Sequence, residues 1–188
     1  MKYVPRILLV AVLGVSGCSA TGSGTSGPPP AGPSAQAAAA GFGGTDLAWI
    51  EINIAMSEQL LPLLELAPKR TKNPQTLSTV LQVKGFTDAE LSVLRQLHTR
   101  AGLPTENPHE GMPMPGMVTP DDVKEASQLS GPAFDKTVSR LIRAHLEQGQ
   151  SLARSEDKSG IEPQTRDLAL QILRTRSGAL STMPSAAP

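Results

Sequence analysis

Four side chains with soft donor atoms lie close together near the middle of the chain. His109, Met112, Met114 and Met117 fall within nine residues, in a stretch that holds three prolines between positions 108 and 115. Thioether sulfur and imidazole nitrogen are donors that copper(I) prefers. The segment therefore predicts a loop that binds a soft metal ion, with copper as the candidate. Because methionine commonly fills irregular gaps, the same residues are also consistent with a cover over the open end of a helical bundle.

The elements that must position these residues come from an internal duplication. At an offset of eighty-nine residues, positions 46–92 align without a gap with positions 135–181. Thirteen pairs are identical, among them Asp46 with Asp135 and a Pro-Gln-Thr triplet in each copy. Chance would give only a few identities over such a span, so the pattern indicates a duplicated supersecondary unit.

Each unit is predicted to consist of two helices. Apolar residues recur at three- and four-residue steps in the first of them, which gives the helix one apolar face. These residues are Trp49, Ile52, Met56, Leu60, Leu63 and Leu64. The second helix should begin at Asn73 as its N-cap with Pro74 at the first helical position, and Pro163 stands at the same place in the second unit.

The helix pairs predict an all-α four-helix bundle over residues 45–184. A single pair cannot bury both its sides, whereas two copies related by a pseudo-two-fold axis can close around one core. Repeat one covers residues 46–98 and repeat two covers 133–183. The Met-rich connection at 99–132 should contain a short extra helix that Thr119 caps.

The duplication also aligns Met56 with His145, at positions that should face inward. The two side chains are therefore candidates for a His-Met site near the pseudo-two-fold axis. The alternative is that both are ordinary core residues, since a single histidine on an apolar stripe is usually hydrogen-bonded within the core.

The N-terminal part of the chain has the features of an export signal followed by a tether. Two basic residues precede the apolar residues 7–15, which are too few to span a bilayer. They lead into small residues before Cys18, a pattern that resembles the lipobox of bacterial lipoproteins. We predict a signal peptide at 1–17, a Gly-, Ser-, Pro- and Ala-rich tether at 18–44 and a disordered tail at 185–188.

Cys18 is then expected to be the lipidated N-terminus, with palmitate among its acyl chains, and to anchor the protein to the outer face of the cell membrane. The alternative is an ordinary signal peptide whose removal takes Cys18 with it. Cys18 is the only cysteine, so the mature fold is expected to have no intramolecular disulfide.

Charge and composition narrow the classes of function. The 17 basic and 17 acidic residues are interspersed and aromatic residues are scarce, so no nucleic-acid partner is expected. With three histidines and no helical Glu-x-x-His pair, the chain lacks an evident means of nucleophilic or di-metal catalysis. We therefore expect a protein that is not an enzyme.

The central segment resembles the bacterial family called domain of unknown function 305. The resemblance rests on His-Glu-Gly-Met-Pro-Met-Pro-Gly-Met at 109–117, followed by Thr119, Gly131 and Phe134-Asp135. It implies an exported protein of duplicated, ferritin-like helix pairs, in a family of which some members bind copper in the periplasm. Family members carry a His-His pair on the first helix of each repeat. Those positions here hold Met56-Ser57 and His145-Leu146.

The Gln and Glu of the family's second helix also differ between the two repeats. They are replaced by Thr87 and Glu90 in the first repeat and by Arg176 and Ala179 in the second. The chain is thus identified as a divergent member of the family.

Two functions from different classes follow. In the first, a tethered protein binds or buffers copper outside the cytoplasm through the Met-rich loop, aided by Met56 and His145. In the second, the bundle binds no metal and acts as an interaction module for another protein of the cell envelope. The surviving loop methionines favour the first hypothesis, and the missing paired histidines favour the second.

Overall fold

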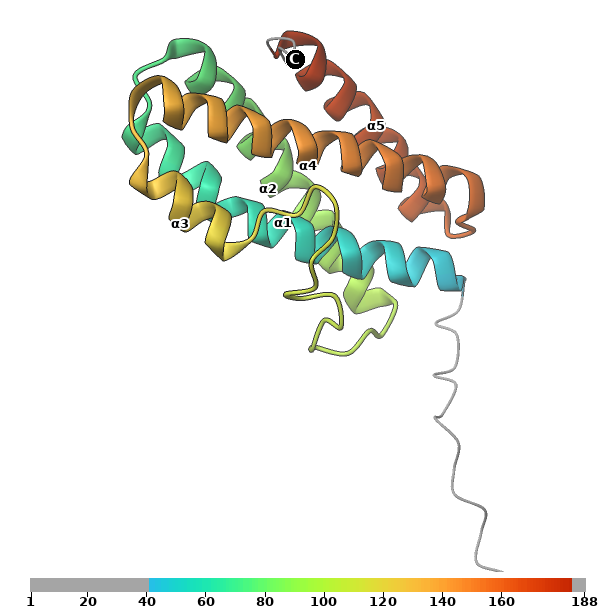
Figure 1. Ribbon diagram of the computed structural model, residues 1–188. Helices are drawn as coiled ribbons and strands as arrows, with labels where there is room; N and C mark the ends of the chain where they lie inside the picture. The colour runs from blue at the N-terminus through green and yellow to red at the C-terminus, as the bar shows by residue number, and fades with distance from the viewer. Residues whose placement is uncertain (1–40, 184–188) are drawn as a thin grey trace, which may run out of the picture. The chain divides into compact units, whose positions relative to one another are not determined.

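The computed structural model of the protein describes residues 41–183. The predicted signal peptide, Cys18, most of the predicted tether and the tail at 185–188 lie outside the described residues. Within them the chain forms five helices and no strand: α1 (Gly44–Arg70), α2 (Pro74–Arg100), α3 (Pro120–Gln128), α4 (Gly131–Ser159) and α5 (Pro163–Thr182) (Figure 1).

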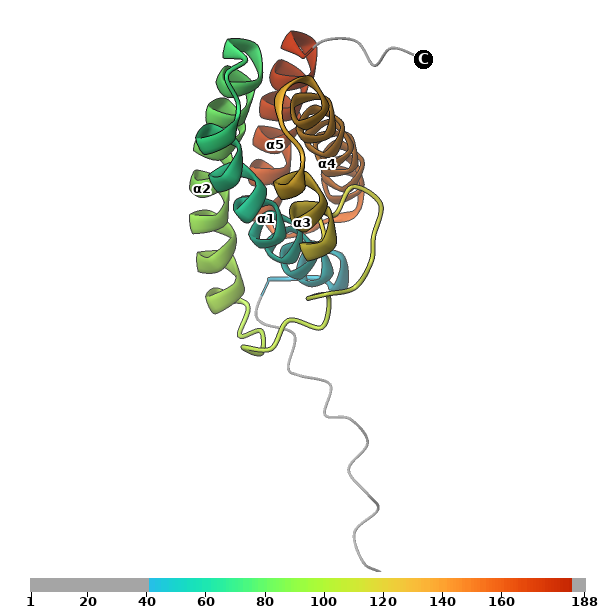
Figure 2. The same ribbon diagram turned by 60° about the vertical axis from the view of Figure 1, so that its left-hand side comes forward.

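The four long helices form two hairpins that pack against each other. The α1 helix lies along α2 and α4 lies along α5, while α1 also contacts α4 and α2 contacts α5 (Figures 1 and 2). The short α3 helix packs on α1 and α4. The predicted all-α architecture, four bundle helices with a short extra helix in the central connection, is confirmed.

The predicted helix starts are also confirmed. The Asn73 side chain accepts hydrogen bonds from the N–H groups of Gln75 (2.9 Å) and Thr76 (3.3 Å) at the start of α2. Glu162 does the same for Thr165 N–H (2.6 Å) at the start of α5. A proline follows each cap at the first helical position. Proline is favourable there because an N–H at this position would have no partner within the helix. The α2 helix then runs unbroken through Gly85.

The duplicated aspartates explain one identity of the repeat. Asp46 Oδ1 accepts from the N–H groups of Ile161 (3.0 Å) and Glu162 (3.1 Å), in the turn between α4 and α5. Its counterpart Asp135 accepts from the Thr71 hydroxyl (2.5 Å), in the turn between α1 and α2. Each aspartate therefore ties the start of one repeat to the turn of the other, as a pseudo-two-fold arrangement requires.

Asp46 also forms a buried acid pair with Glu156 of α4. Both side chains are fully buried, and apart from Asp46 the Glu156 carboxyl has no hydrogen-bond partner. Burial, followed by the hydrogen bond to Asp46 and its charge, raises the pKa of Glu156 to about 8. Burial alone would raise the pKa of Asp46 too, but hydrogen bonds from Glu156 and three backbone N–H groups lower it. The two carboxyl groups therefore share one proton at neutral pH.

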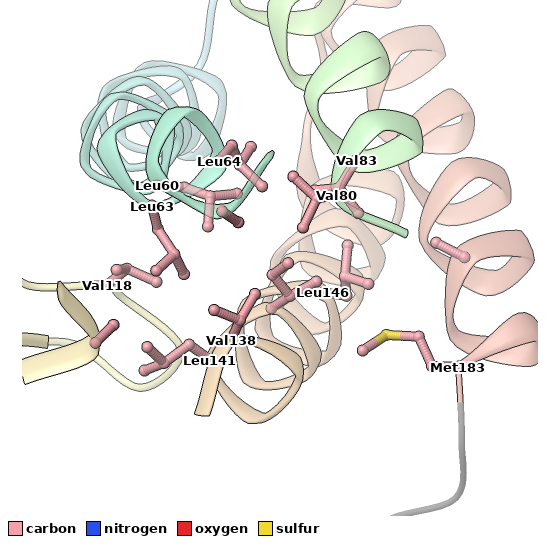
Figure 3. Packing of buried hydrophobic residues seen from close by; sticks show 14 of the residues in the cluster. Leu60, Leu63, Leu64, Val80, Val83, Val118, Val138, Leu141, Leu146 and Met183 are labelled. Carbon is pink, nitrogen blue, oxygen red and sulfur yellow. The ribbon is translucent and has the colours of Figure 1, made fainter. Parts of the chain in front are cut away.

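Two apolar clusters fill the bundle, one toward each end. The first joins all four long helices and the central connection, with α1 facing α2 and α4 (Figure 3). Its members include Leu60, Leu63, Leu64, Val83, Phe134, Val138, Leu141, Ile142, Leu146 and Met183. The second holds Trp49, Ile50, Ile54, Leu91, Leu94, Leu97, Leu168 and Ile172, together with Phe42 from the predicted tether. Phe42 extends the packed domain slightly beyond its predicted start.

Candidate functional site

A buried ion pair lies between the two apolar clusters. Arg176 of α5 approaches Glu90 of α2 with both terminal nitrogens, at 2.7 Å from Nη2 to Oε2 and 3.1 Å from Nη1 to Oε1. The Thr175 hydroxyl donates to the same Oε1 at 3.0 Å. The side chains of Arg176 and Glu90 are only 3% and 1% exposed. The attraction between the two opposite charges offsets the free-energy cost of removing both groups from water.

The surroundings of Arg176 are shaped to admit its large side chain. Its guanidinium carbon lies 4.4 Å from the centroid of the Phe86 ring. On the opposite helix, Gly149 leaves the space that Arg176 fills, because a β-carbon there would lie 3.3 Å from Arg176 Nε. Burial raises the pKa of Glu90, which the Arg176 charge opposes, and burial lowers the pKa of Arg176, which the Glu90 charge opposes.

His145 lies one helical turn before Gly149 and is fully buried, as its apolar stripe predicted. Burial, and then the charge of Arg176, lowers the pKa of His145 to about 3, although a hydrogen bond with the Gly116 backbone works against this. Its Nδ1 has no hydrogen-bond partner. The imidazole is therefore neutral at physiological pH and has one ring nitrogen that no other group uses.

The loop before α3 is fastened to the bundle by Gln59 of α1. With its nitrogen facing the Val118 carbonyl, the Gln59 amide donates to that oxygen (3.2 Å) and accepts from Gly111 N–H (3.1 Å). It thereby closes residues 111–118 into a small loop. A turn inside the loop, in which Met117 N–H donates to the Met114 carbonyl (3.1 Å), brings the chain back toward α1.

Gly116 lets this loop approach α4 closely. Its φ of +72° lies in the left-handed region, and a β-carbon would lie 2.5 Å from the Ala144 carbonyl oxygen and 2.6 Å from Gln148 Cβ. Only glycine avoids both the backbone strain of a positive φ and the collision with α4. The loop backbone therefore rests directly on α4, above His145.

We expect Gly116→Ala to lower the free energy of unfolding by about 2 kcal/mol more than Gly111→Ala, because only the former adds a collision with α4. Gly111 is a matched control, since its φ is also +72° and a β-carbon there meets nothing within 4 Å. Urea denaturation of the two variants measures the difference. Equal losses would mean that the close approach to α4 contributes nothing to stability.

The structure brings methionines of the Met-rich loop close to Met56, which the sequence had placed in a separate candidate site. Met117 of the loop is buried and packs with Met56 and Ala55 of α1, and the half-buried Met114 packs against this group. We call Met56, Met114 and Met117 the thioether cluster. His145 adjoins it through Gly116, the residue before Met117.

The other two predicted loop ligands lie outside the thioether cluster. Met112 is 48% exposed. His109 Nε2 lies 3.9 Å from Glu51 Oε2, and the neighbouring Asn107 amide donates to the Glu51 carbonyl at 2.8 Å. This end of the loop is therefore held to α1 at Glu51, five residues before Met56.

The donors that could hold a metal ion here are neutral ones. Across residues 41–183, no three His, Cys, Asp or Glu side chains are grouped so that they could hold a metal ion. The thioether cluster with His145 offers three sulfur atoms and one imidazole nitrogen, a set suited to a soft ion. Hard cations such as Mg²⁺ and Ca²⁺ prefer oxygen donors, which the cluster lacks.

The roles of Arg176 and Glu156 were not predicted from the sequence. Both carried a detectable signal, because each is a charged residue at a helical position that the apolar periodicity assigns to the core. Arg176 lies four residues after Ile172 on the buried face of α5, and Glu156 lies three after Ala153 on that of α4. A charged residue at such a position predicts a buried partner.

The sequence and the fold resemble those of known proteins. The sequence matches the family described as Domain of unknown function (DUF305) over residues 46–187. No curated protein matches the chain. In residues 41–183, none of the helices is both long and apolar enough to cross a membrane.

Two solved structures share the fold at low sequence identity. A DUF305 fragment from Deinococcus radiodurans aligns with a TM-score of 0.66 and 19% identity, covering 76% of this chain and 95% of that one. A DUF305 protein from Streptomyces coelicolor, described as a candidate secreted protein, aligns with a TM-score of 0.67 and 16% identity, covering 74% and 88%. The chain belongs to the DUF305 family.

Proposed function

We propose that the protein binds copper(I) outside the cytoplasm, through Met56, Met114 and Met117 with His145 as a fourth donor. The observation that carries the proposal is the thioether cluster, in which two loop methionines pack against Met56, next to the Gly116 backbone with which His145 forms a hydrogen bond. The role proposed is that of a binding or buffering protein and not of an enzyme.

The electrostatic surroundings favour a monovalent ion. All four donors are uncharged, and the buried Glu90 carboxylate is already paired with Arg176. A divalent ion would be poorly compensated in such a buried site. Because the pKa of His145 is about 3, protons should not compete for its nitrogen in mildly acidic surroundings.

The test is a copper(I) titration under anaerobic, reducing conditions with bicinchoninate as the competing chelator. The full chain with Cys18→Ser is used, because the Cys18 thiol would otherwise bind copper itself. We expect submicromolar affinity, weakened at least about 30-fold in the variant Met56→Leu, Met114→Leu, Met117→Leu, since about 2 kcal/mol of ligation is lost. Leucine keeps the side chains apolar and of similar volume.

Met183→Leu is the matched control. Met183 is buried in the first core cluster, away from the thioether cluster, so this change should leave the affinity within about threefold of the parent chain. Copper(I) binding that survives the triple change, or no measurable binding by the parent chain, would exclude the proposed site.

The proposed location is the outer face of the cell membrane, with the lipid on Cys18 as the anchor. The signal and lipobox pattern at 1–18 supports it, and the Streptomyces coelicolor relative described as a candidate secreted protein agrees with export. Labelled palmitate should be incorporated into the parent chain and not into Cys18→Ser. Equal labelling of the two chains, or no labelling of the parent chain, would argue against the lipid anchor.

A second candidate function is a metal-free interaction module for another envelope protein. Leu81 of α2 and Leu170 of α5 occupy equivalent positions in the two repeats and are 54% and 37% exposed. A protein that fails to bind copper(I) in the titration above retains only this second function.

A further inference from the structure

The methionines of residues 41–183 form a gradient of exposure from the surface to the bundle interior. Met56 and Met117 are 2% and 7% exposed, Met114 is half-buried, and Met112 is 48% exposed. Met183 belongs to the first core cluster and is also buried. Met112 is therefore the one thioether of the described chain that an external donor of copper can reach freely.

The loop that carries the gradient is held at several points. Gln59 closes it between Gly111 and Val118, and Gly116 rests on α4 beside His145. Swinging the whole loop outward would break these contacts and expose buried Met117 to water. An ion can reach the thioether cluster with less disruption if it is first bound at the surface and then passed inward.

The spacing along the loop provides this route. Met112 precedes Met114 by two residues, and Met114 turns back onto Met117 through the hydrogen bond between their backbones. Copper(I) exchanges between soft ligands by binding the incoming donor before the outgoing one leaves, so that the ion remains coordinated. No electron or proton transfer is needed in such a step.

We propose that Met112 is the exchange ligand of the site, through which copper(I) passes between the thioether cluster and an external carrier with sulfur or imidazole donors. This inference rests on the proposed copper(I) function and adds the route by which the ion arrives and leaves. Met112 then sets the rate of transfer, whereas Met56, Met114 and Met117 set the affinity.

The experiment measures the two quantities separately. The copper(I)–bicinchoninate complex is mixed in a stopped-flow instrument with the metal-free Cys18→Ser chain, and the loss of its colour gives the rate of transfer. We expect Met112→Leu to slow the transfer about tenfold while changing the equilibrium affinity by less than about threefold. Met117→Leu should instead weaken the affinity.

A conservative variant shows that a donor atom is what matters. Met112→His restores an exposed soft donor and should return the rate to within about threefold of that of the parent chain, which a purely structural role of Met112 would not explain. Met183→Leu should change neither quantity.

Several outcomes would overturn the inference, and they differ from failure of the proposed function. Transfer to Met112→Leu at the parental rate, or a loss of affinity as large as that in Met117→Leu, would refute Met112 as the exchange ligand while leaving copper(I) binding in place. Colour that persists with the parent chain even at equilibrium would refute the proposed function and this inference together.

Discussion

Arg176→Met should lower the free energy of unfolding by about 3–5 kcal/mol, because it leaves the buried Glu90 carboxylate without a counter-charge. Only 1% of the Glu90 side chain is exposed, so water cannot replace the lost partner. Since burial already raises the pKa of Glu90, the variant should recover part of its stability in acid, where this carboxyl is protonated. Urea denaturation at two pH values measures both effects.

The double variant Arg176→Met, Glu90→Leu is the control for this prediction. It removes both charges at once, and a buried ion pair replaced by apolar residues of similar volume is often neutral or stabilising. We therefore expect the double variant to be more stable than Arg176→Met alone. A single variant within about 1 kcal/mol of the parent chain would mean that Glu90 is compensated by a group other than Arg176.

The second large effect is a fall in stability toward alkaline pH that depends on Glu156. Its folded pKa of about 8 lies above the ordinary value of 4.5, so the contribution of its bound proton is complete below about pH 4.5 and is lost as the pH rises through 8. The unfolding free energy should decrease by about 2–4 kcal/mol between pH 5 and pH 9.

Glu156→Gln removes this dependence. The glutamine amide can still donate a hydrogen bond to Asp46 but cannot ionise, so the variant should lose less than about 1 kcal/mol over the same range. Glu65→Gln, at an exposed position on α1, should keep the parental pH dependence. If Glu156→Gln fell in stability as steeply as the parent chain, another group would be responsible for the slope.

The pair of Asp46 and Glu156 also affects the stability of the N-terminal end of α1. Asp46 accepts from Gly43 N–H at 2.6 Å and from the turn between α4 and α5, so it joins the first residues of α1 to the second repeat. Charging Glu156 places a second negative charge beside Asp46. The start of α1 is therefore the part of the bundle expected to loosen first in alkali.

The fold could be predicted from the sequence because several independent signals agree. The offset of eighty-nine residues, the apolar stripe through Trp49 and Leu60, and the Asn73 cap before Pro74 all specify the same helix pair. Because the unit is duplicated, the second half of the chain should form a second helix pair, and the two pairs should pack together into a bundle. A fold can be predicted from the sequence alone when local and global signals agree in this way.

The candidate site could be predicted only in part. The stripes placed Met56 and His145 inside the bundle, and both are buried. The position of the loop could not be inferred, because a segment rich in proline and glycine has no periodicity that assigns it to a face. Its docking uses the Gln59 amide, the bond from Asn107 to Glu51 and the absence of a side chain at Gly116, which are contacts between parts of the chain distant in sequence.

The most direct test of the copper(I) site is X-ray absorption spectroscopy at the copper edge. The Cys18→Ser chain, loaded with one equivalent of copper(I), should show a first shell dominated by sulfur together with one nitrogen or oxygen scatterer. The sulfur contribution should fall in Met56→Leu, Met117→Leu. A first shell of nitrogen and oxygen alone, or a sulfur shell unchanged by those two substitutions, would contradict a site built from the loop and α1 together.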